Sequence, residues 1–236
     1  LPPLPARADC NRRAPMNTMP DYPALARLLA PLADPARAVQ MQAYMKNRFP
    51  FLGIPKPQLK ATLKPHLKAA AREGVDWQTI DACWQAEARE YQYAALELLR
   101  AVQKQLTPAD LPRLHRLITT KSWWDTIDFL DRIVGGIALR YPKINAVILD
   151  WSRDDNIWLR RIAIDHQLLR KEKTDTELLA QILDNNLGQS EFFINKAIGW
   201  VLRDYSKTNP EWVREYIERR HEKMAALSIR EATKYL

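Results

Sequence analysis

Glycine, cysteine and long apolar runs are scarce in this 236-residue sequence. Its 6 glycines fall well below the average usage of about 7%, which disfavours turn-rich all-β folds and glycine-rich nucleotide loops. Cys10 and Cys83 form no CxxC motif, so neither a disulfide framework nor a zinc site is expected, and the usage fits a reducing cytoplasm. No run of about 18 apolar residues occurs, so we expect no membrane segment.

Positive charge and tryptophan are abundant instead. Lys and Arg total 36 against 28 Asp and Glu, which gives a net charge of +8, and there are 8 tryptophans. Hydrophobic residues make up 47% and charged residues 27% of the chain, which excludes a mostly disordered protein. Indole rings together with excess positive charge indicate an anionic or aromatic partner.

Proline is concentrated near the start of the chain. Of the 16 prolines, 12 lie within residues 1–65, and the first 20 residues contain no apolar segment typical of a secretory signal. We therefore predict that residues 1–21 are a disordered or non-native extension and that residues 22–236 form one domain. Further along, Thr107 and Asn209 each stand directly before a proline and are predicted helix N-caps.

Helical periodicity dominates the rest of the sequence. Apolar residues recur at spacings of three and four, and no Asn-Gly or Asp-Gly hairpin turn interrupts them, so we predict an all-α fold of about twelve helices. Aromatic residues near helix starts repeat at Tyr91, Trp124, Trp158 and Phe193, with spacings of 33, 34 and 35 residues. This period predicts a curved α-solenoid of antiparallel helix pairs, although helices of similar length can coincide by chance.

Such a solenoid presents one concave face, and basic residues fall on or beside the aromatic-led helices. A positive track of this kind suits the phosphate backbone of a nucleic acid. Its candidate members are Lys121, Arg153, Arg160, Arg161, Arg170, Lys171, Lys173, Lys196, Arg203 and Lys207.

Two helical segments contain residues that could bind a ligand or take part in catalysis. Trp124 and Asp128 are spaced i, i+4 and share one helix face, as do Arg161 and Asp165. A carboxylate beside an indole suits a cationic ligand, but a core tryptophan and an aspartate paired with a neighbouring arginine would give the same pattern. His166 stands alone among apolar neighbours, and we expect it to pack rather than to catalyse.

A third segment contains Gly199 and Trp200 within a helical pattern. Glycine there costs about 1 kcal/mol relative to alanine, so a helix or a ligand is expected to approach closely. Trp200, Arg203 and Lys207 form one helical stripe, which fits either a nucleic-acid groove or a core tryptophan with solvated bases.

Four strings resemble the AlkD family of bacterial DNA alkylation-repair glycosylases, and the similarity runs from about residue 22 to the C-terminus. They are YMKNRFPFLGIPKP (44–57), TKSWWDTID (120–128), SRDDNIWLRRIAI (152–164) and FFINKAIGWVLRDYSKTNP (192–210). The resemblance implies HEAT-like helical repeats acting on duplex DNA that carries cationic alkylated purines such as 7-methylguanine and 3-methyladenine.

The same resemblance implies roles for individual residues. Asp128 matches the catalytic carboxylate, Trp124 and Trp200 match the aromatic groups around the lesion, and Arg161 matches a DNA-contacting arginine. The remaining candidates for DNA binding are Tyr44, Lys46, Lys121, Arg203 and Lys207.

The expected activity is base excision by a monofunctional glycosylase, because no lysine is singled out as a Schiff-base nucleophile. We expect no metal and no cofactor, no membrane partner, and a monomer that works in the bacterial cytoplasm at the nucleoid. Two other interpretations stay open at this point: a non-catalytic HEAT-repeat protein that binds bent or branched DNA, and a protein–protein scaffold.

Overall fold

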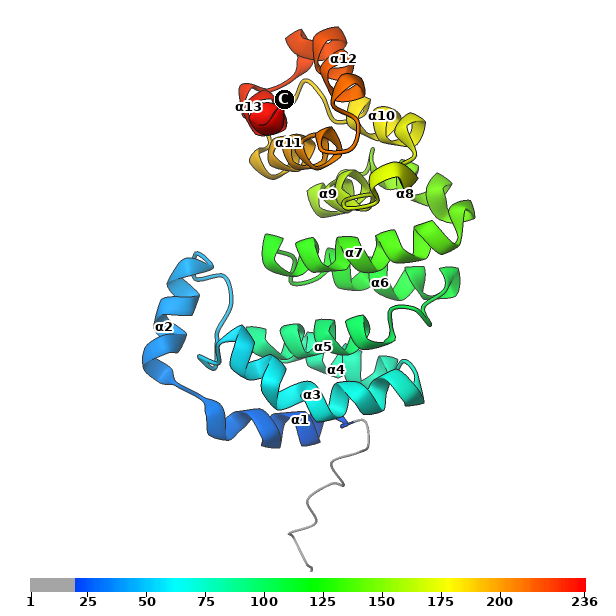
Figure 1. The fold of residues 1–236 in the computed structure, drawn as a ribbon. Helices are drawn as coiled ribbons and strands as arrows, with labels where there is room; N and C mark the ends of the chain where they lie inside the picture. Colours follow the sequence, from blue (N-terminus) through cyan, green and yellow to red (C-terminus); the bar gives the residue numbers. More distant parts are fainter. Residues whose placement is uncertain (1–19) are drawn as a thin grey trace, which may run out of the picture. The chain divides into compact units, whose positions relative to one another are not determined.

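The computed structural model describes residues 20–236, and all regular structure within that range is helical (Figure 1). Thirteen α-helices occupy these residues, joined by short 3-10 turns, so the all-α prediction is confirmed. Residues 1–19 of the expected extension lie outside the described range. None of the helices in residues 20–236 is long and apolar enough to cross a membrane.

The chain divides into two compact units, of which the first ends at Val102 and the second is Gln103–Leu236. The single domain expected over residues 22–236 stays a prediction.

The first unit is organised around its last helix. It comprises α1 (Tyr22–Leu29), α2 (Pro35–Tyr44), α3 (Lys56–Glu73), α4 (Trp77–Gln85) and α5 (Arg89–Val102), with α3 and α4 both packed against α5. Buried Glu90 on α5 accepts hydrogen bonds from the backbone N–H groups of Leu52 (2.8 Å), Gly53 (2.8 Å) and Ile54 (3.1 Å). This carboxylate fixes the loop before α3. Cys83 is fully buried, and burial raises the pKa of its thiol to about 12. The thiol is therefore protonated and packs as a small apolar side chain.

The second unit stacks two layers of helices. In one layer α7 (Trp124–Arg140), α9 (Ile157–Asp165), α11 (Phe192–Ser206) and α13 (Ala226–Ala232) pack successively against one another. Beside them lie α6 (Leu111–Thr119), α8 (Asn145–Trp151), α10 (Thr176–Asp184) and α12 (Pro210–Arg220). Asn209 caps α12 by accepting from the N–H of Trp212 (3.0 Å), as predicted, whereas Thr107 caps a 3-10 turn, Pro108–Asp110, rather than an α-helix.

The repeat is visible in the hydrogen bonds that join successive repeats. Arg170 donates to the carbonyl of Gly135 (2.7 Å), and Asn186 donates to that of Ser152 (2.9 Å). These pairs are 35 and 34 residues apart, which is the period of the aromatic pattern. Each repeat therefore bonds to the next in the same register, as expected for a helical repeat protein. The curvature of the solenoid stays a prediction.

Close helix approach explains the glycine within α11. A Cβ at Gly199 would lie 2.5 Å from the Cβ of Glu231 on α13, a distance that real contacts do not allow. The sequence left open whether a helix or a ligand approaches Gly199, and the structure shows a helix, α13.

Candidate active site

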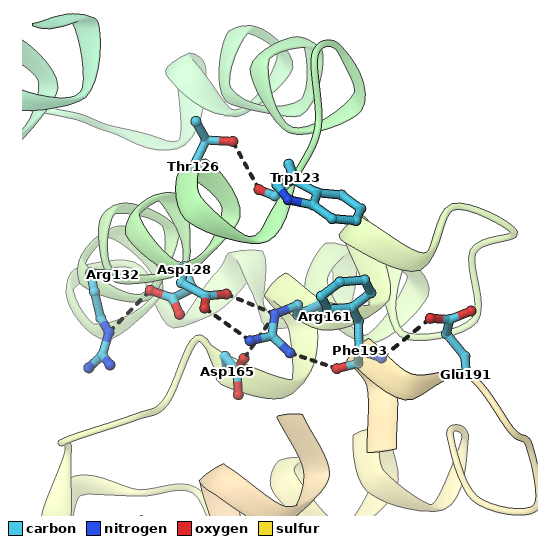
Figure 2. Close-up of polar contacts among 9 residues, drawn as sticks. Trp123, Thr126, Asp128, Arg132, Arg161, Asp165, Glu191 and Phe193 are labelled. Atoms are coloured by element: carbon cyan, nitrogen blue, oxygen red, sulfur yellow. Dashed lines mark hydrogen bonds and ion pairs between the residues drawn. The ribbon is translucent and has the colours of Figure 1, made fainter. Parts of the chain in front are cut away.

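Asp128 and Arg161 form the centre of the site (Figure 2). Arg161 Nε donates to Asp128 Oδ1 at 2.8 Å, and its Nη2 donates to Oδ2 at 3.0 Å. The paired, parallel geometry is the strong form of an arginine–carboxylate interaction. Asp128 keeps 24% of its side chain exposed while Arg161 keeps 2%. A buried cation thus holds a carboxylate that solvent, or a substrate, still reaches.

Arg161 also ties three helices together. Its Nη1 donates to the carbonyl of Phe193 at 2.6 Å, so α7, α9 and α11 all meet at this guanidinium. The sequence had left open a purely structural pairing of Asp128 with an arginine, and such a pair is present. The DNA contact expected of Arg161 stays a prediction, and holding Asp128 is the role that its bonds show.

Trp200 joins the pair from α11. The centre of its ring lies 5.2 Å from the guanidinium carbon of Arg161, and the indole is half-buried. Trp124 is the first residue of α7 and stands one turn before Asp128, also half-buried. The structure therefore brings together Asp128, Arg161 and Trp200, and it places Trp124 on the helix that carries Asp128.

Aromatic residues at the starts of successive repeats pack against one another, and Trp123 takes part in this cluster. The ring of Trp123 lies 5.7 Å from that of Trp158 and 5.1 Å from that of Phe193, and the last two are 5.0 Å apart. Trp123 precedes α7 with extended backbone, and its side chain reaches the aromatic residues of the next two repeats. The sequence pattern had pointed to Trp124 and not to its neighbour Trp123.

Two further aspartates lie behind Asp128, and sequence reasoning missed their role. One oxygen of each of Asp128, Asp131 and Asp165 lies within 4.8 Å of the others. Asp165 Oδ2 is 3.8 Å from Arg161 Nε, and Asp131 Oδ1 is 3.1 Å from Arg132 Nε. The signal was available, because Asp131 follows Asp128 by three residues and Asp165 follows Arg161 by four, which places each pair on one helix face.

Burial dominates the protonation of these two acids. It raises the pKa of Asp165 to about 7, against the opposing effect of Arg161. It also raises the pKa of Asp131 well above its usual range, and the charge of Asp165 adds to that rise. Neighbouring His166 is buried and donates from Nδ1 to the carbonyl of Ala163 (2.6 Å), while burial lowers its pKa to about 3. His166 is therefore neutral and packs, as expected.

The basic side chains of α11 have partners within the second unit. Glu231 Oε1 accepts from Lys196 (2.9 Å), and its Oε2 accepts from Arg203 (2.8 Å) and Lys234 (3.0 Å). Hydrogen bonds from Lys196 and Lys234 lower the pKa of Glu231 to about 2. Lys207 lies 4.9 Å from the centre of the Tyr235 ring. Arg203 and Lys207 thus have partners in the protein, and their contacts with DNA stay predictions.

A pocket of about 440 Å³ continues along α7 beyond Asp128. It lies between the C-terminal half of α7 and the segment after α9, and exposed Lys171 and Lys173 lie in its wall. Its charged lining residues are Arg132, Arg170, Lys171, Glu172 and Lys173, four bases against one acid.

The remaining DNA-binding candidates lie on loops and helix ends. Tyr44, 69% exposed, ends α2, and exposed Lys46 follows it with a left-handed backbone (φ 57°). Both belong to the first unit. Lys121 stands before α7 in the second unit, half-buried and also left-handed (φ 49°). Their roles stay predictions.

Comparison with known proteins decides the family. The family model described as DNA alkylation repair enzyme matches residues 25–236. This chain belongs to the DNA alkylation repair enzyme family. A solved structure from Enterococcus faecalis, titled a predicted DNA alkylation repair enzyme, is 36% identical and covers 86% of this chain and 96% of its own, with a TM-score of 0.80. No curated protein in the comparison matches.

Membership of the DNA alkylation repair enzyme family gives the site its context. The family match covers the whole second unit and most of the first, so the Asp128–Arg161 pair and the pocket beside it both lie within the matched region. The role of the chain is therefore the repair of alkylated DNA.

Proposed function

We propose that this repair enzyme is a monofunctional DNA glycosylase that hydrolyses the N-glycosidic bond of cationic alkylated purines, such as 7-methylguanine and 3-methyladenine, in duplex DNA. One observation carries the proposal. A partly exposed carboxylate, Asp128, is fixed through both oxygens by a buried arginine, and the ring of Trp200 lies beside that arginine.

The chemistry needs an anion rather than a proton donor. Alkylation at N7 or N3 makes the purine cationic, so the C1′–N9 bond of 7-methylguanine breaks with its electron pair leaving on a neutral base. Positive charge then develops on the sugar, and a water oxygen adds to C1′ and loses a proton. A carboxylate at about 4 Å contributes roughly 4 kcal/mol to that charged state at an effective dielectric constant of 20, before desolvation is subtracted.

Aromatic rings supply selectivity for the charged lesion. A cation over an indole face gains about 0.5–2 kcal/mol, which a neutral purine does not. Trp200 already lies beside one cation, Arg161, and half-buried Trp124 begins the helix that carries Asp128. We assign both indoles to the lesion or its sugar.

Strand cleavage is not part of the proposed reaction. Lys196 has its ammonium 5.9 Å from the centre of the Trp200 ring and 2.9 Å from Glu231 Oε1. The ammonium is held by Glu231, and no lysine is singled out as a Schiff-base nucleophile. The proposed partner is duplex DNA, bound by a monomer in the bacterial cytoplasm, and the net charge of +8 supports attraction to phosphate.

The test compares the chain with its Asp128→Asn variant on duplex DNA that contains 7-methylguanine. Release of the free base is expected to fall by at least about 100-fold, because the variant keeps the shape but not the charge. DNA affinity, measured by fluorescence anisotropy, is expected to change little. Near-equal release by the two proteins would refute the mechanism.

A second candidate function rests on the ion pair itself. Since Arg161 occupies both oxygens of Asp128, the pair also fits a non-catalytic protein that binds bent or branched DNA. That candidate predicts no release of base by either protein and tighter binding to branched than to linear duplexes.

A further inference from the structure

The feature that the proposed function leaves unexplained is the pair of aspartates behind Asp128. Asp131 and Asp165 are 2% and 1% exposed. Neither Oδ1 of Asp131 nor either oxygen of Asp165 has a hydrogen-bond partner among the described residues. A buried carboxylate without hydrogen bonds is strongly disfavoured as an anion. Some further positive charge must therefore balance this part of the site.

Charge counting identifies that missing partner as a proton. Asp128, Asp131 and Asp165 bring three negative charges, and Arg132 and Arg161 bring two positive ones. One proton makes the cluster neutral, whereas a divalent cation would leave it positive. One proton on the buried pair therefore balances the charges of the cluster. Burial raises the pKa values of both aspartates, which agrees with that count.

The charged groups that act on Asp165 come from two helices. From α7 they are Asp128, Asp131 and Arg132, and from α9 the group is Arg161. His166 follows Asp165 in the chain and is neutral. From α11, the Phe193 carbonyl and the Trp200 ring contact Arg161. Lys196 on α11 is paired with Glu231.

Resting on the proposed glycosylase function, we propose that Asp165 is a positioning residue that shares one proton with Asp131 and controls how tightly Arg161 holds Asp128. The geometry is a competition for one donor. Arg161 Nε donates to Asp128 Oδ1 at 2.8 Å and lies 3.8 Å from Asp165 Oδ2. When the shared proton is present, Asp128 alone attracts the guanidinium. When it is lost, Asp165 competes, and Asp128 faces the substrate with more of its negative charge.

Binding of the cationic lesion is coupled to release of the shared proton. A positive base and sugar beside Asp128 favour loss of that proton from the buried pair. By linkage, the deprotonated cluster binds the positive charge of the lesion more strongly. Neutral purines do not provide this exchange. The cluster thus couples the charge of the lesion to the charge of the catalytic carboxylate.

The experiment measures single-turnover release of 7-methylguanine between about pH 6 and about pH 8. For the unmodified protein the rate is expected to rise by about tenfold over this range, as one buried negative charge appears near the reacting sugar. Asp165→Asn, which mimics the protonated form, is expected to give a flat profile. Asp150→Asn is the matched control, because Asp150 is an exposed aspartate on α8 and its loss leaves the profile unchanged.

A second readout does not depend on catalysis. Infrared difference spectra between the same two pH values are expected to show loss of one protonated carboxyl in the unmodified protein and none in Asp165→Asn. Parallel rate profiles for the two proteins would overturn the positioning role. If the unmodified protein releases no base at any pH, the glycosylase proposal fails. The infrared band then decides the shared proton by itself, and its absence overturns that proton too.

Discussion

Trp200 lies near cations of two ion-pair clusters, Arg161 and Lys196, and the clusters have net charges of opposite sign. The aspartate cluster (Asp128, Asp131, Asp165, Arg132, Arg161) has three acids and two bases. The Glu231 cluster (Glu231, Lys196, Arg203, Lys234) has one acid and three bases. Both connect consecutive repeats of the second unit, so repeat packing alone does not explain the difference.

The two clusters also differ in the hydrogen bonds that their carboxylates accept. Both oxygens of Glu231 accept hydrogen bonds from its cations, and its anionic form is favoured. In the aspartate cluster, the oxygens of Asp165 accept none from the described residues. A satisfied cluster of this kind stabilises the fold, whereas buried and unsatisfied acids beside a partly exposed carboxylate are typical of a functional site.

The largest difference is expected from a matched pair of arginine substitutions. Arg161→Gln leaves three carboxylates facing one another, and the free energy of unfolding at neutral pH is expected to fall by about 3–5 kcal/mol. Arg203→Gln removes one of three cations around Glu231, and a loss of at most about 1 kcal/mol is expected. Urea unfolding of both variants measures the contrast.

Acidification provides the control for that pair. At about pH 5 the carboxylates left by Arg161→Gln take up protons, so part of the lost stability returns, while the Arg203→Gln difference stays small. Equal losses for the two variants at neutral pH would show that the clusters are energetically alike.

The contrast between the clusters was only partly predictable from the sequence. Periodicity gave the helices, and spacings near 34 gave the register that places Arg161 opposite Asp128. The sequence did not show which charged side chains would be buried. Lys196 and Glu231 are 35 residues apart, so the repeat contains that pair too, yet nothing in the local pattern showed that the α11 bases would be turned toward α13. Propensity acts within a helix, whereas these bonds depend on how neighbouring repeats pack.

Trp123 and Trp124 illustrate the same limit. The sequence presents two adjacent indoles, and the start of α7 lies between them. Extended backbone at Trp123 sends that ring into the Trp158–Phe193 cluster, and helix α7 begins at Trp124. Which of the two indoles joins this aromatic cluster depends on a helix boundary of one residue, and sequence patterns do not resolve helix ends that finely.

The pH dependence of stability is expected to show a difference of intermediate size between the two clusters. The folded-state pKa of Asp165 is raised from 3.8 to about 7. The contribution of Asp165 to the free energy of unfolding is therefore fully present below about pH 4 and is lost as the pH rises to about 7. The pKa of Glu231 is lowered from 4.5 to about 2, so its contribution is present above about pH 4.5 and is lost as the pH falls through 2.

Asp165→Asn isolates the first of these effects. Relative to the unmodified protein, the variant is expected to gain about 2 kcal/mol of unfolding free energy between about pH 5 and about pH 8. Glu231→Gln is expected to give no such gain over this range, because Glu231 stays ionised throughout. Urea unfolding at both pH values measures the two differences. A constant offset for Asp165→Asn would mean that the buried pair holds no proton near neutral pH.

The smallest effect is expected at the pocket beside the aspartate cluster. Lys171 and Lys173 are exposed and line that pocket, whereas the cations of the Glu231 cluster are held by an acid. If the two lysines meet phosphates, the double substitution Lys171→Ala/Lys173→Ala removes about two counterion-releasing contacts, and the slope of log affinity against log salt flattens by about 1.8. Lys234→Ala, which removes a cation from the Glu231 cluster, is the matched control and should leave the slope unchanged. Anisotropy titrations across a salt series test both. Equal slopes for all three proteins would place the DNA backbone away from this pocket, because a phosphate contact cannot be removed without changing the number of counterions released.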